Sequence, residues 1–179
     1  LTPTLSVPEA WVTCLAANGQ SVVASGARYT GISTTSNYFL LRMDDTGVLD
    51  PSFGTMGEAV PTVAAAVFIR AFVLLPDGRI ALAGYTGDMT NGSGYIDFLA
   101  AVHTADGAPY TPFGGSGYAV GTFATPVNES YAIKAQADGK LVLCGITNLN
   151  IGNPSATIVR YENDLNTLVT SSAQETGLF

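Results

Sequence analysis

The sequence predicts an all-β protein built from three repeats, and three observations carry that prediction. The turn glycines Gly19, Gly78 and Gly139 lie 78 − 19 = 59 and 139 − 78 = 61 residues apart, each just before an apolar run. The segment 47–54 (GVLDPSFG) is echoed by 107–114 (GAPYTPFG), an offset of 107 − 47 = 60. The chain is 47% apolar, only 12% charged and carries 20 glycines, which is typical of strands joined by tight turns.

Each repeat reads as four strands. The second and third strands of the middle repeat flank Asp77-Gly78, and Asn18-Gly19 and Asp138-Gly139 lie at the same place in the other repeats. An Asx-Gly pair between apolar runs predicts a two-residue hairpin turn in which both residues take positive φ. No stretch has helical periodicity over the length that a helix needs. In the middle repeat the expected strands are 57–62, 66–75, 79–85 and 95–104.

Longer polar loops join the third and fourth strands, at 27–37, 86–94 and 147–155. These loops vary in length and sequence between repeats while the strands around them do not. Such variation is typical of a scaffold that presents binding residues on its surface loops. The candidate binding residues are polar or aromatic members of these loops and their ends: Arg28, Tyr29, Tyr85, Asp88, Asn91, Tyr95, Asn148 and Asn150.

Two segments are characteristic of the repeat, 76–85 (PDGRIALAGY) and 49–57 (LDPSFGTMG). In these segments the chain resembles the delta-60 repeat family of bacterial β-propeller proteins. The second repeat departs from the pattern at Pro109-Tyr110, and the third has lost the motif apart from Gly177. The resemblance implies three four-stranded propeller-type blades, part of a propeller, in one domain over 1–179 with blades at approximately 1–56, 57–116 and 117–177. A β-trefoil is the alternative fold, because it also uses three repeats of four strands.

The blade architecture explains several residues of the repeat. The central strands of a blade are packed on both faces, which fits the continuous apolar runs after each turn. Gly26, Gly84 and Gly145 are expected at crowded strand ends where no side chain fits. Phe53 and Phe113 are expected to fill the space between consecutive blades.

Three blades are too few to close a ring, since propellers have about four to eight. The sequence starts without Met and stops where a further strand would begin, so we expect either further blades in a longer parent chain or a second copy that completes six blades. Without such a partner the end blades would expose apolar faces.

Composition excludes several partners and cofactors. The net charge of −7 argues against nucleic acid and anionic membranes, and no run is long and apolar enough to span a bilayer. No phosphate-binding glycine loop and no His/Cys cluster with metal-ligand spacing occurs, so no cofactor or metal is expected. Cys14 and Cys144 are read as unpaired thiols, with a disulfide as the alternative.

Candidate catalytic groups are few. His103 aligns with Arg42 and Arg160 of the other repeats and is read as a structural residue at a strand end. Asp44, Asp45 and Asp50 could pair as acid and base, but turns collect aspartates for structural reasons. The loop at 88–93 lacks the alternating oxygens and closing Glu of a calcium loop.

We therefore expect a non-enzymatic scaffold, secreted or on a cell surface, that binds a protein or carbohydrate partner through its variable loops. A glycan-acting propeller hydrolase or lyase and a purely structural assembly module are the alternatives. Converging carboxylates from several repeats would favour the enzyme, and open blade faces would favour the assembly module.

Overall fold

A computed structural model of the chain confirms the all-β prediction. It describes twelve strands in three antiparallel sheets of four strands each, and no helix occurs among the described residues. The three sheets do not close on themselves, which agrees with propeller-type blades in an incomplete array. The described residues are 10–19, 21–29, 36–63, 66–87, 95–123, 125–149, 154–161 and 168–171.

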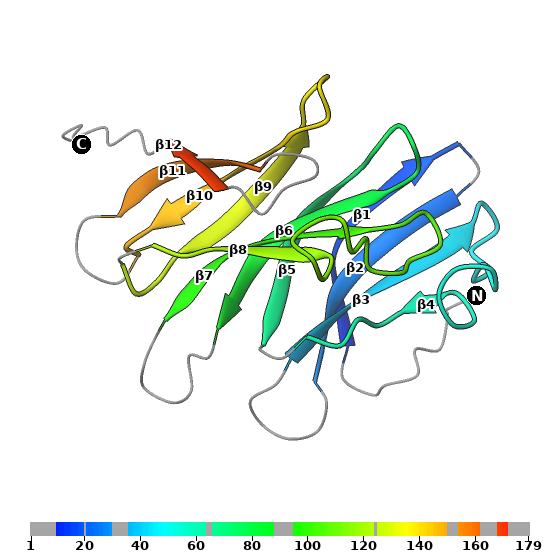
Figure 1. Cartoon of the computed structure of the whole chain (residues 1–179). Helices are drawn as coiled ribbons and strands as arrows, with labels where there is room; N and C mark the ends of the chain where they lie inside the picture. Colours follow the sequence, from blue (N-terminus) through cyan, green and yellow to red (C-terminus); the bar gives the residue numbers. More distant parts are fainter. Residues whose placement is uncertain are drawn as a thin grey trace.

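Each sheet is a meander of four consecutive strands (Figure 1). The first sheet consists of β1 (Ala10–Asn18), β2 (Ser21–Tyr29), β3 (Ser36–Asp44) and β4 (Glu58–Ala59). The second consists of β5 (Val67–Leu74), β6 (Ile80–Gly87), β7 (Ile96–His103) and β8 (Tyr118–Gly121). The third consists of β9 (Glu129–Ala135), β10 (Leu141–Thr147), β11 (Ser155–Tyr161) and β12 (Leu168–Ser171).

The sheets stack face to face in chain order. β5 packs against β1, β2 and β3, and β9 packs against β5, β6 and β7. The first strands of the three sheets, β1, β5 and β9, therefore lie next to one another, and we call them the inner strands. The middle sheet is covered on both faces. We call the two contact layers the first seam, between the first and second sheets, and the second seam, between the second and third.

Each seam has its own apolar core. Phe53 is fully buried in the first seam among residues of both sheets, such as Leu40 and Leu82. Phe113 lies 60 residues further on and is buried in the second seam, where its ring lies 5.9 Å from that of Tyr161. The prediction that these two phenylalanines fill the space between consecutive blades is confirmed.

A β-bulge interrupts the inner strand of every sheet at the same place. Its extra residue is Thr13 in β1, Arg70 in β5 and Tyr131 in β9, as the pairing with β2, β6 and β10 shows. Opposite each bulge lies a glycine, and a Cβ on Gly84 would fall 1.8 Å from the carbonyl oxygen of Phe68. Gly26 and Gly145 face equivalent carbonyls at 2.0 Å, so the expected crowding at the three glycines is confirmed. Their expected location at strand ends is wrong, because they lie within β2, β6 and β10.

The hairpin turns differ from the prediction. The backbone N–H of Leu75 donates to the carbonyl of Arg79, and that of Gly78 donates to the carbonyl of Leu75. These bonds define a three-residue loop, 76–78, in which only Gly78 has a positive φ. The third sheet repeats this turn around Gly139. In the first sheet Asn18 pairs directly with Ser21. The expected two-residue Asx-Gly turn is therefore wrong, because in each sheet the Asx residue stays outside the left-handed region.

The expected phase of the repeat is also wrong. Glu58 and Ala59 pair with β3 as the fourth strand of the first sheet, whereas 57–62 was predicted as the first strand of the middle blade. Met56 and Gly57, both at positive φ, make the tight turn that sends the chain back along β3. Likewise β8 lies beyond residue 116, the predicted end of the middle blade, but it belongs to the second sheet.

Candidate functional site

The structure places the predicted binding residues unevenly. Tyr95, just before β7, is 57% exposed, and Asn148 follows β10 with a φ of 63°. Arg28 lies within β2, where its Nη1 is 3.5 Å from Oε1 of Glu58, and Tyr29 is the last residue of that strand. Asp88, Asn91 and Asn150 lie outside the described residues.

Tyr85 does not lie in a loop. It belongs to β6, is buried, and stacks on Phe68 with the ring centroids 5.1 Å apart. Its role is therefore in the packing of the second sheet. The expectation that the loop starts near residue 86 also fails, because β6 continues to Gly87.

A buried asparagine draws Tyr95 and Asn148 into one region. The side-chain amide of Asn128 donates to the carbonyl of Ile96, at 3.1 Å, and to Oδ1 of Asp97, also at 3.1 Å. Its Oδ1 accepts from the backbone N–H of Asn148 at 3.3 Å. Because a fully buried amide with these partners is fixed in place, Asn128 ties the start of β7 to the end of β10. Sequence reasoning missed Asn128 as a candidate residue.

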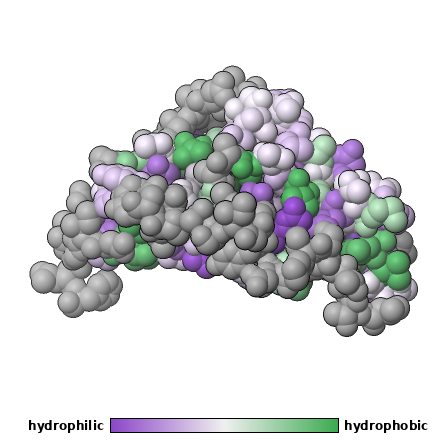
Figure 2. Space-filling model, turned by 90° about the horizontal axis from the view of Figure 1, so that it is seen from below, coloured by the Kyte–Doolittle hydropathy of each residue, from purple (hydrophilic) through white to green (hydrophobic). Residues whose placement is uncertain are grey.

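This region lies at the end of the sheets where β6 and β7 are connected, and Figure 2 views the molecule from that side. Among the described residues visible there, apolar and hydrophilic ones occur in small, mixed patches.

A second group of side chains lies where the inner strands β5 and β9 meet. Arg70 pairs with Glu129 at 3.2 Å, and its guanidinium lies 5.3 Å from the ring centroid of Tyr85 and 5.9 Å from that of Tyr131. Arg70 and Tyr131 are the extra residues of two equivalent bulges, and bulges re-aim the side chain they carry. The bulges thus turn one residue of each inner strand toward its neighbour.

His103 is a structural residue, but its predicted alignment is wrong. It pairs with Ile80 in the second sheet as Tyr161 pairs with Leu141 in the third, so it corresponds to Tyr161 and to Met43 rather than to Arg42 and Arg160. Its Nδ1 donates to the carbonyl of Gly107 at 2.8 Å, and its Nε2 accepts from the hydroxyl of Tyr38 at 2.7 Å.

Burial sets the protonation of these seam residues. It lowers the pKa of His103, so the imidazole is neutral, in agreement with one nitrogen donating and the other accepting. Burial also raises the pKa of Tyr38 and of Tyr161, and Asp97 raises the latter further. Asp97 is itself partly buried, and burial raises its pKa.

The turn aspartates are engaged in their own turns. Oδ1 of Asp44 accepts from the backbone N–H of Thr46 and of Val48 at 2.9 Å, and Oδ1 of Asp50 accepts from the N–H of Ser52 at 2.9 Å. Hydrogen bonds from Thr46 and Ser52 hold the pKa of the two carboxyl groups below its usual value. Both carboxyl groups are therefore ionised and cap their turns, whereas a general acid needs a raised pKa.

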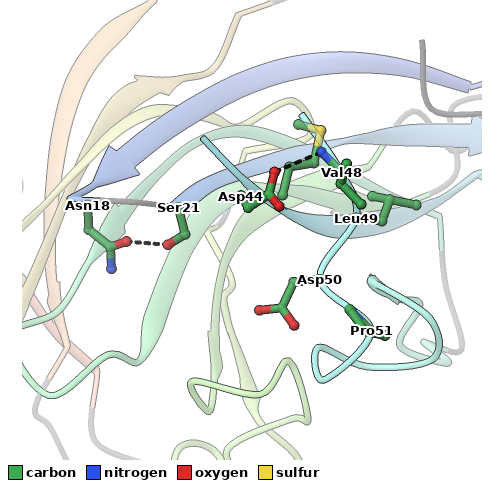
Figure 3. A pocket seen from close by; sticks show the side chains of 8 residues that line it. Asn18, Ser21, Asp44, Val48, Leu49, Asp50 and Pro51 are labelled. Atoms are coloured by element: carbon green, nitrogen blue, oxygen red, sulfur yellow. Dashed lines mark hydrogen bonds between the residues drawn. The ribbon is translucent and has the colours of Figure 1, made fainter. Parts of the chain in front are cut away.

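An open pocket of about 420 Å³ lies beside these turns (Figure 3). Its lining combines Asp44 and Asp50 with apolar groups such as Leu49 and Pro51, and Ser21 donates to Asn18 at its edge. Within the described residues, no three His, Cys, Asp or Glu side chains gather as a metal site would require. Both cysteines are free.

The fold and these contacts define the class of protein: an all-β array of propeller-type blades. In agreement, residues 136–166 match a protein-family model described as "Domain of unknown function (DUF5122) beta-propeller". The matched segment contains the turn around Gly139, β10 and β11. No curated protein matches the chain. Among the described residues, no helix has the length and apolar character that crossing a membrane would require.

Proposed function

We propose that the protein is a non-enzymatic β-propeller scaffold of the delta-60 repeat type, secreted or on a cell surface, which binds a protein or carbohydrate partner. The observation that carries the proposal is the use of its titratable groups. His103, Arg70 and Glu129 join neighbouring sheets, and Asp44 and Asp50 cap turns. A site that holds such groups in structural hydrogen bonds supports scaffolding better than acid–base chemistry.

The binding surface we propose is the end of the sheets around Tyr95 and Asn148. Tyr95 offers an exposed aromatic ring, and the buried Asn128 holds the neighbouring backbone of Ile96 and Asn148 in place. A rigid backbone with an amphipathic ring is suited to stacking on a sugar or a peptide, because little ordering is needed on binding.

The experiment is a binding screen against immobilised oligosaccharides, with hits measured in solution by calorimetry. Tyr95→Ala should reduce the affinity of any hit by about tenfold or more, because hot-spot aromatics carry at least about 1.4 kcal/mol. Tyr131→Ala, an exposed tyrosine at the inner strands, is the matched control and should bind as the parent does. Equal losses in both variants would contradict this location.

The enzyme alternative is tested separately. Ester, peptide and glycoside substrates should show no turnover. Hydrolysis that disappears in Asp44→Asn or Asp50→Asn, with the circular dichroism spectrum unchanged, would replace the scaffold proposal with a hydrolase. The assembly-module alternative is favoured by one specific observation, the exposure of Ile158 in the third sheet.

A further inference from the structure

Two of the three sheets place a cation just before their second strand. In the second sheet, Nε of Arg79 lies 2.7 Å from Oδ2 of Asp77, and the guanidinium lies over the ring of Tyr110, 4.5 Å from its centroid. In the third sheet, Nζ of Lys140 lies 3.2 Å from Oδ2 of Asp138. β6 and β10 each begin at the next residue, so a cationic side chain of the chain itself occupies this end of both sheets.

The first sheet has a serine where the other two have a cation. Ser25 and Ala83 are equivalent, because each pairs with the residue that follows the bulge of the inner strand. Counting back along each strand by the same number of residues makes Ser21 the equivalent of Arg79. The corresponding pairing in the third sheet adds Lys140 to this set. A serine side chain is too short to fill the space that an arginine occupies.

The ring beneath Arg79 is also replaced in the first sheet. In the second sheet, the backbone N–H of Phe113 donates to the carbonyl of Tyr110. In the first sheet, the equivalent Phe53 donates to Asp50, so Asp50 is the equivalent of Tyr110. The first sheet therefore has a small side chain in place of the cation and a carboxylate in place of the aromatic ring.

The open pocket of about 420 Å³ lies at this place (Figure 3). Its lining includes Ser21 and Asp50, the equivalents of Arg79 and of the ring beneath it. Asp44 adds a second carboxylate, and Leu49 contributes apolar surface. A volume of this size is within the range of small-ligand sites. The pocket therefore opens where the second sheet holds a guanidinium group.

Within the described residues, the carboxylates of the pocket are only partly neutralised. Those of Asp44 and Asp50 are ionised, because hydrogen bonds hold the pKa of both below its usual value. Arg42 approaches Asp50 from the side of the first seam. Its Nε lies 2.8 Å from Oδ2 of Asp50, and its Nη1 donates to the carbonyl of Ala105 in the second sheet. Two carboxylates and one guanidinium leave one net negative charge, which one additional cation would balance.

We propose that this pocket binds a guanidinium group on an alkyl stem, as the arginine side chain of a partner polypeptide presents it. The apolar lining from Leu49 and Pro51 would contact the methylene groups of the stem, while the carboxylates of Asp44 and Asp50 attract the guanidinium. Asp44 ends β3, whereas Tyr95 precedes β7, so the pocket lies at the opposite end of the strands from the surface around Tyr95. It is therefore a second, separate binding site.

The binding test uses two capped tripeptides, glycine–arginine–glycine and its uncharged citrulline analogue. Each is titrated into ¹⁵N-labelled protein, and the backbone amide of Val48, which donates to Asp44, is the reporter. The arginine peptide should bind with a Kd on the order of 1–10 mM, and the citrulline peptide at least about fivefold more weakly. Equal affinities would overturn the proposal. Free L-arginine is titrated in the same way, and binding at least about tenfold tighter than the tripeptide would refute a polypeptide partner.

Two matched variants locate the site. Asp44→Asn should weaken binding of the arginine peptide by at least about fivefold, because a charge-assisted contact is lost. Asp45→Asn removes an exposed carboxylate from the same turn but outside the pocket lining, and it should bind as the parent chain does. Both variants change the net charge equally. Equal losses in both would therefore show general attraction to an acidic protein and contradict a pocket.

A third test needs no ligand. Ser21→Arg restores the cation of the other two sheets, so its side chain should fill the pocket and abolish binding of the arginine peptide. It should also unfold at a higher urea concentration than Ser21→Gln, whose side chain is long but uncharged, because only the guanidinium balances the carboxylates. Equal unfolding midpoints for these two variants would contradict the proposal. None of these readouts involves Tyr95, so the pocket and the surface around Tyr95 stand or fall separately.

Discussion

Replacing Gly84 by alanine tests the bulge that recurs in every inner strand. An alanine Cβ at this position would lie 1.8 Å from the carbonyl oxygen of Phe68 and 2.8 Å from its carbonyl carbon. Both contacts are with backbone, so β5 must move by roughly 1 Å or more to reach an ordinary separation. Overpacking costs about 1–3 kcal/mol, and a lost ladder hydrogen bond adds about 1 kcal/mol. The free energy of unfolding should therefore fall by about 2–4 kcal/mol.

Urea denaturation followed by circular dichroism measures this loss, and a chain of this length should lose on the order of 10 °C in Tm. Gly115→Ala is the matched control, because a Cβ there meets nothing within 4 Å and the only penalty is its φ of +76°. That penalty is about 1–2 kcal/mol. If Gly84→Ala proves no more destabilising than Gly115→Ala, the steric argument for the three glycines is refuted.

Three further predictions concern the seams. Phe113→Ala should reduce the free energy of unfolding by about 3–5 kcal/mol in a denaturant titration, because the ring fills the second seam; a loss below 1 kcal/mol would contradict that role. Tyr38→Phe should reduce it by about 1–3 kcal/mol by leaving Nε2 of buried His103 unpaired, and a neutral thermal melt would count against the hydrogen bond. Because burial lowers the pKa of His103, the unfolded chain binds a proton more readily, so stability should decline as the pH falls below about 6.5; His103→Gln should flatten this part of the profile.

The period of the repeat could be read from the sequence, but its phase could not. The spacing of Gly19, Gly78 and Gly139 gives the length of the unit without saying which strand begins it. Whether residues after Gly57 join the sheet before or after them depends on the turn at Met56, whose positive φ is unusual for a residue with a side chain. Sequence reasoning therefore assigned two strands, β4 and β8, to the wrong sheet.

The turn between the first two strands differs between the sheets. The second and third sheets use a three-residue loop around Gly78 and Gly139, whereas Asn18 pairs directly with Ser21, so aligning the glycines does not align the inner strands. The candidate binding residues, Tyr95 and Asn148 among them, were predicted from loop polarity, and their role in binding stays a prediction. Loop polarity could not find Asn128, because only the fold brings that residue between β7 and β10.

The covering of the middle sheet on both faces has a consequence for how the protein opens. β6 and β7 are almost entirely buried, while the other two sheets each have only one described neighbour. In a one-dimensional stack, stability depends on the number of neighbours, so local opening starts at the outer members. The amide protons of β6 should exchange last of all. The middle repeat would then be the nucleus to which the flanking repeats attach and from which they detach, one at a time.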